Sequence, residues 1–168
     1  MFGRNGVIGG GAALDGRRAI NQAIVQAAGS SLTIETVALS RCMSESDTLR
    51  MALMAHELAS HAHTQQIAAC NAAHGLEERL CRWLLQSRDL LLSDTLPLTQ
   101  EFLSQMLGVQ RSSVTMVAKK LQASGLIKYR RGHIQIEDVE GLHDCSCECY
   151  ETVNRHFERL IGWRPNHS

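Results

Sequence analysis

The sequence lacks several features that would place it in common protein classes. It has no run of about 18 apolar residues, the length that a helix needs to cross a bilayer. Its first 16 residues lack the charged-then-apolar order of a secretory signal. We therefore expect a cytoplasmic protein with no membrane partner, in which the six cysteines stay reduced.

Net charge is also absent, because 17 Lys and Arg residues balance 17 Asp and Glu residues. The chain therefore has no global field that would attract a polyanion, and any such affinity must come from a local patch. With 168 residues, of which 44% are hydrophobic and 20% charged, the composition is that of a globular protein with one domain or two small ones.

Motifs for phosphate and zinc chemistry are missing as well. The glycine run 9–11 has neither the GxxxxGK[ST] nor the GxGxxG spacing of phosphate-binding loops. In the stretch HELASHAH, His56 and His61 are five residues apart, whereas the zincin motif needs two histidines four apart on one helix face. We therefore assign no catalytic residue and no cofactor.

Residues 1–46 differ from the rest of the chain. They hold seven of the thirteen glycines, between short apolar runs. This pattern predicts short strands with turns, too few to close a β-roll alone.

From about Asp47 the pattern becomes helical, and no Gly or Pro interrupts residues 44–73. About 25 residues of helix would be about 38 Å long, which is long for a chain of this size. An approximate heptad seam indicates a dimerisation helix, with a core helix of a monomer as the alternative. The seam residues are Met51, Met54, Leu58, Ala62 and Gln65.

The stretch 98–136 carries a helix-turn-helix pattern. Thr99 can cap a first short helix, and Gly108 ends it because glycine enters the left-handed conformation without steric cost. A second helix, about 111–124, has an apolar stripe at helical spacing and a polar, basic opposite face. Gly125 ends it, and 126–129 with 133–136 predict a β-hairpin, the wing.

This stretch is locally cationic. It holds six Lys and Arg residues against the single acid Glu101. Such a patch favours a phosphate backbone through counterion release. Before it, 75–92 predicts a scaffold helix; after it, Asp138 can cap one last helix that runs to Trp163. In a continuous helix Cys145, Cys147 and Cys149 cannot all face one centre, so we interpret them as small buried residues and assign no metal ligand.

The segment LTQEFLSQMLGVQRSSVTMVAKKLQASGLI, its short wing, the preceding EERLCRWLL and the long helix together resemble the Crp/Fnr superfamily of bacterial transcription regulators. The resemblance covers about residues 47–142 and implies a homodimer that binds double-stranded DNA, with RNA polymerase as a further expected partner. Residues 1–46 look like the last part of that family's sensor β-roll. The stretch GVIGGGAALDGRRAINQA does not reproduce the family's cyclic-nucleotide cassette, so we expect no such ligand.

The resemblance also implies roles for single residues. Arg111, Ser112 and Met116 would face base edges in the major groove. Residues nearer the phosphates would be Thr99, Gln110, Ser113, Thr115, Lys119, Arg130, Arg131 and His133.

The expected fold is mainly α, of α+β type. It has a β-roll remnant at 1–46, a dimerisation helix at 47–72, a winged helix-turn-helix at 73–142 and a C-terminal helix at 143–168. Two alternatives stay open: a winged-helix module that binds proteins, and a metal or redox sensor that uses the histidines and cysteines.

Overall fold

The computed structural model describes residues 1–4, 6–15, 18–19 and 21–164. It is mostly helical, with one small sheet, as expected for the predicted α+β fold. In chain order the elements are α1 (Gly10–Asp15), α2 (Thr36–Glu45), α3 (Asp47–Ala73), α4 (Leu76–Leu91), β1 (Thr95–Leu96), α5 (Gln100–Leu107), α6 (Arg111–Ala123), β2 (Ile127–Arg130), β3 (His133–Ile136), α7 (Val139–Asp144) and α8 (Cys149–Ile161).

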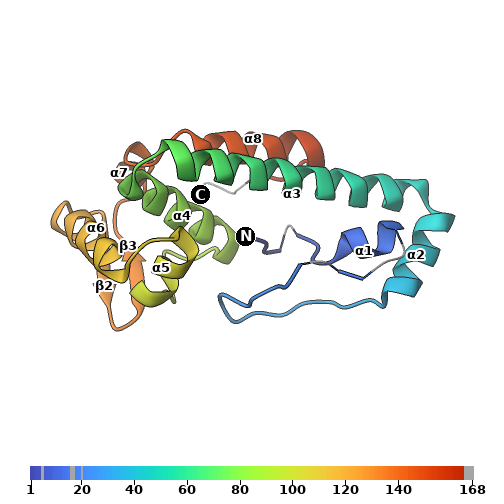
Figure 1. Cartoon of the computed structure of the whole chain (residues 1–168), viewed down its shortest axis with the longest axis horizontal. Coiled ribbons are helices and arrows are strands. Elements are labelled where there is room, and N and C mark those ends of the chain that lie inside the picture. The colour runs from blue at the N-terminus through green and yellow to red at the C-terminus, as the bar shows by residue number, and fades with distance from the viewer. Residues whose placement is uncertain (5, 16–17, 20, 165–168) are drawn as a thin grey trace.

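The long helix α3 forms the spine of the molecule. Figure 1 shows α8 alongside it, with α1 and α2 at one end and α5, α6 and the sheet at the other. The side chain of Ser46 caps α3 by accepting a hydrogen bond from the Leu49 amide at 3.2 Å. One side of the helix is buried against α8, α1 and α2, and the predicted uninterrupted helix is confirmed. Within the described residues, no helix has both the length and the apolar character that a bilayer span requires.

The main core is built around α4. Leu80 and Leu84 of this helix are fully buried, and they share one apolar cluster with Leu103 of α5 and Leu121 of α6. Each such leucine contributes about 1.5–3 kcal/mol by leaving water. The predicted scaffold helix behind the helix-turn-helix is therefore confirmed.

The sheet has the order β1-β3-β2, and both pairings are antiparallel. The pairing of β2 with β3 confirms the β-hairpin that was predicted for these residues. The sequence pattern does not predict strand β1, because two residues are too few to show a periodicity. Leu96 of β1 pairs with Ile134 and is fully buried, so this short strand joins the core.

The N-terminal segment differs from its prediction. The described residues of 1–46 contain α1 and α2 and no strand, so the expectation of short strands there is wrong. A strand needs a partner for its backbone groups, whereas these helices pack on α3 through Ala13, Met43 and Leu53. The β-roll interpretation of this segment stays a prediction, and residues 5, 16–17 and 20 lie outside the described part.

The C-terminal segment is also different, because the single predicted helix is two. The predicted cap is present, since Asp138 accepts a hydrogen bond from the Gly141 amide at 2.9 Å. The amide and hydroxyl of Ser146 both donate to the His143 carbonyl, which ends α7 in a tight turn. Helix α8 then begins at Cys149, and residues 165–168 of the predicted helix lie outside the described part.

Candidate nucleic-acid interface

The turn between α5 and α6 is fixed by backbone and side-chain hydrogen bonds. Thr99 caps α5 by accepting from the Phe102 amide at 3.1 Å, as predicted. Gly108 has φ +66°, the left-handed conformation expected of it. The buried Arg79 of α4 donates to the Leu107 carbonyl, so the scaffold helix holds the end of α5 directly.

Helix α6 has one buried and one exposed face. Its buried residues are Val114, Val117, Ala118 and Leu121. Arg111, Ser112 and Lys119 are exposed, and Met116 is 67% exposed although it is apolar. The three predicted base-reading residues therefore lie on the outward side of one helix.

The wing turns tightly beside the start of α5. Arg131 and Gly132 both have positive φ, +47° and +82°, the pattern of a type I′ turn in a two-residue hairpin loop. The Tyr129 hydroxyl accepts from the Gln100 amide at 3.1 Å, and the Tyr129 amide donates to Gln122 at 3.0 Å. Tyr129 thus ties the wing to both helices of the motif.

Two of the six cations of the segment are paired with acids. Lys120 lies 2.6 Å from Glu77, and this hydrogen bond and charge raise the pKa of Lys120. Lys128 lies 2.7 Å from Glu137. The other four, for which the described part of the chain shows no acidic partner within ion-pair distance, are Arg111, Lys119, Arg130 and Arg131. The available positive charge therefore lies along α6, at Arg111 and Lys119, and at the wing tip.

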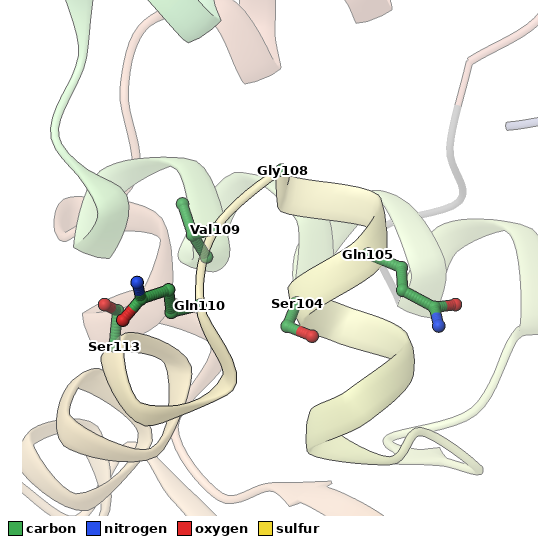
Figure 2. Close-up of a pocket in the computed structure, with 6 residues that line it drawn as sticks. All are labelled: Ser104, Gln105, Gly108, Val109, Gln110 and Ser113. Atoms are coloured by element: carbon green, nitrogen blue, oxygen red, sulfur yellow. The ribbon is translucent and has the colours of Figure 1, made fainter.

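The remaining predicted contact residues lie around these two features. Gln110 and Ser113 line a shallow depression at the α5–α6 turn, shown in Figure 2. The Thr115 hydroxyl lies 2.7 Å from the Gln100 side-chain oxygen and 2.9 Å from the Arg111 carbonyl, so its proton is used within the protein. Thr99 and His133 are exposed.

The predicted dimer residues lie on the side of α3 that faces away from its buried side. Met51, Met54 and Leu58 are 61%, 49% and 55% exposed. Further along, Ala62 is half-buried and Gln65 exposed. An apolar stripe is therefore open to solvent in the single chain.

Sequence reasoning missed the residues that position the motif. Arg79, Gln100, Gln122 and Tyr129 hold the two helices and the wing in place. Their partners are distant in sequence, and the one local signal was that Gln100 directly follows a predicted cap.

Comparison with known protein families shows what this region is similar to. Residues 78–145 match the family model of the Crp-like helix-turn-helix domain. This part of the chain is similar to Crp-like helix-turn-helix domains. The resemblance to Crp-like regulators is thereby confirmed for this helix-turn-helix domain.

Solved structures agree with the fold. FixK2 from Bradyrhizobium japonicum aligns with a TM-score of 0.61 and 14% identity, over 68% of this chain and 60% of that one. A Crp/Fnr-family protein from Eubacterium rectale aligns with a TM-score of 0.51 and 22% identity, over 71% of this chain and 52% of that one. The chain thus matches less than two thirds of the length of either protein. No curated protein matches the sequence.

Proposed function

We propose that the chain is a sequence-specific DNA-binding transcription regulator of the Crp/Fnr type, which acts as a homodimer on a palindromic site. Helix α6 enters the major groove and the wing contacts the backbone. Contact with RNA polymerase is a further part of this proposal. The proposal excludes catalysis as the chain's role.

The observation that carries the proposal is the exposed face of α6 within a Crp-like domain. Arg111 lies in the first turn, where a guanidinium can donate two hydrogen bonds to guanine, worth about 1–3 kcal/mol of discrimination. Arg130 and Arg131 extend the cationic surface at the wing, where they can neutralise phosphates without reading sequence. This division predicts separable effects on specificity and affinity.

The direct test is selection from a pool of random duplexes, followed by sequencing, at two salt concentrations. A palindromic motif is expected, with half-sites about 34–36 Å apart or a multiple of this. Salt-sensitive binding without a motif would contradict sequence-specific recognition. Salt-insensitive capture of a protein partner, with no DNA binding, would favour an interaction module.

Single substitutions then separate base reading from backbone contact. Arg111→Ala should weaken binding to the selected site more than binding to random duplex. Lys119→Ala and Arg130→Ala should weaken both equally and reduce the salt dependence. Equal losses on both duplexes for all three variants would remove Arg111 from the role of reader.

The homodimer is supported by the exposed apolar stripe of α3, because its opposite side is already occupied by α8. Leu58→Glu would place a charge within that stripe and should shift the protein to monomer in sedimentation velocity. Thr64→Glu, at an exposed position of the same helix away from the stripe, is the matched control. A wild-type protein that is monomeric at all concentrations would contradict this part of the proposal.

A further inference from the structure

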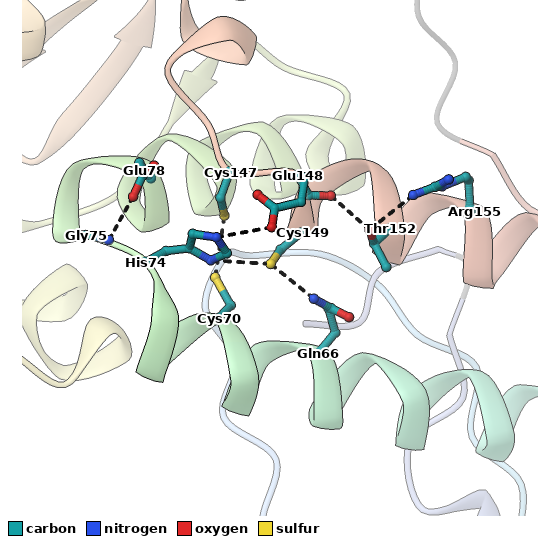
Figure 3. A network of polar contacts seen from close by, with 10 residues as sticks. All are labelled: Gln66, Cys70, His74, Gly75, Glu78, Cys147, Glu148, Cys149, Thr152 and Arg155. Carbon is teal, nitrogen blue, oxygen red and sulfur yellow. Dashed lines mark hydrogen bonds and ion pairs between the residues drawn. The ribbon is translucent and has the colours of Figure 1, made fainter.

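A cluster of three thiols and one imidazole lies where the end of α3 meets the start of α8. Cys70 is near the end of α3 and His74 directly follows it, while Cys147 precedes α8 and Cys149 begins it. Three Sγ atoms and one ring nitrogen lie within 4.8 Å of one another. Figure 3 shows the four side chains turned toward one another between the two helices. The cluster exists because the chain breaks between α7 and α8, which the expectation of one continuous helix did not foresee.

The distances in the cluster fit a tetrahedral metal site. A zinc ion with Zn–S bonds of about 2.3 Å and a Zn–N bond of about 2.0–2.1 Å holds its ligand atoms about 3.5–3.8 Å apart. The Cys70 and Cys147 sulfurs are 3.5 Å apart, and the Cys149 sulfur is 3.6 Å from Nδ1 of His74. Little movement is needed for the four atoms to surround one ion.

Burial and donor type narrow the choice of ion. Cys70, Cys147 and Cys149 are between 0% and 4% exposed, and thiolates with imidazole suit Zn²⁺ rather than Mg²⁺ or Ca²⁺. We propose that Cys70, His74, Cys147 and Cys149 bind one Zn²⁺ ion in a closed structural site. Four protein ligands leave no position for water or substrate, so the site is not catalytic.

Two residues beside the cluster contact the proposed zinc ligands rather than the ion itself. The Glu148 carboxylate lies 3.2 Å from Nε2 of His74, which orients the ring with Nδ1 toward the thiols. The Gln66 side-chain amide donates to the Cys149 sulfur at 3.1 Å, a contact that favours a thiolate. A cluster of merely apolar cysteines would not require either partner.

A disulfide is the competing use of these thiols. The Cys70 and Cys147 sulfurs are 3.5 Å apart, whereas a disulfide needs about 2.05 Å. It would also leave Cys149 and His74 without a role. Zinc binding requires no oxidant: the three thiols release their protons to solvent, the imidazole stays neutral, and the ion joins α3 to α8.

The test uses the full chain, purified under reducing conditions and stripped with a chelator. Metal analysis before stripping should give one zinc per chain. Returning Zn²⁺ should raise the unfolding temperature, and Co²⁺ in its place should give the absorption of a tetrahedral thiolate site. Absence of zinc, with no stabilisation by added Zn²⁺, would overturn the proposal, as would a Cys70–Cys147 disulfide in the reduced preparation.

Ligand variants assign the ion to the cluster. Cys149→Ser and His74→Gln should lose the stoichiometric zinc, whereas Cys42→Ser and His61→Gln, at exposed positions outside the cluster, should keep it. Because His74 is half-buried and follows its helix, its variant tests the site without opening the core. Equal zinc in the His74 and Cys149 variants and in the controls would place the ion elsewhere and overturn the proposal.

Glu148 gives a finer test, because it touches a ligand and not the ion. Glu148→Gln should fold and keep the tetrahedral Co²⁺ spectrum, with zinc affinity about tenfold lower. An unchanged zinc affinity would overturn the positioning role given to Glu148.

Discussion

The helix pairs α5–α6 and α3–α8 present polar groups in opposite directions. The first buries its apolar side chains and turns cations outward, an arrangement suited to a large, solvated anion whose binding falls with salt. The second turns thiols and an imidazole inward, where they can hold one small cation away from solvent. In the proposed functions, exposed charge serves a macromolecule and buried donors serve an ion, so the two regions should respond differently to core truncation, acid and salt.

The largest loss of stability should come from truncating a buried side chain beneath the cationic face of α6. Leu121 on α6 is 1% exposed, and Leu121→Ala leaves a cavity without changing any charge. We expect the free energy of unfolding to fall by about 2–5 kcal/mol, measured by chemical denaturation. A loss below about 1 kcal/mol would mean that the outward face does not depend on this core.

Low pH should destabilise the packing of α3 against α8, mainly through His63. This side chain is buried in α3 with its ring edge-on to Phe157 of α8, and burial, with nearby positive charge, lowers the pKa of His63 to about 3. The unfolded chain, with a pKa of about 6.5, binds the proton first, so stability is complete above that value and falls as pH decreases toward 3.

Between pH 7 and pH 5 the loss from His63 should be about 2 kcal/mol. Chemical denaturation at both pH values measures this loss of unfolding free energy. Zinc-free protein is used so that metal binding by the thiols does not contribute. His63→Gln should reduce the pH dependence by that amount, and His61→Gln, on the exposed side of the same helix, should not. An identical pH dependence in wild type and His63→Gln would refute the assignment.

Prediction from sequence succeeded where the cause is local. Thr99, Gly108 and the 133–136 strand were placed correctly because a cap, a left-handed turn and a hairpin each depend on a few neighbouring residues. The cysteine cluster was missed because Cys70 and Cys147 are 77 positions apart and a side-chain turn at Ser146 interrupts the helical pattern. The pairing of Lys120 with Glu77 is likewise a tertiary fact that a count of charges cannot show.

The cap of α5 should have an intermediate effect. Thr99→Ala removes the oxygen that accepts from the Phe102 amide and should cost about 1 kcal/mol of unfolding free energy. Thr64 is a matched control, because its hydroxyl donates back to the Ser60 carbonyl within α3 and caps nothing. Thr64→Ala should be nearly neutral in the same denaturation experiment. Equal losses for both variants would mean that Thr99 contributes as an ordinary surface residue.

The smallest effect should come from substituting one of two adjacent lysines on α6. Comparing the two variants is also the sharpest test of the exposed, cationic face of this helix. Lys119 has no acidic partner within ion-pair distance among the described residues, whereas Lys120 is held 2.6 Å from Glu77 and its charge is already balanced. If Lys119 contacts a phosphate, Lys119→Ala should reduce the slope of log affinity against log salt by about 1, and Lys120→Ala should leave it nearly unchanged. Binding titrations on one duplex across a salt series measure both slopes. Equal reductions would show that net charge alone drives association, while the expected difference would show that DNA follows the geometry of this face.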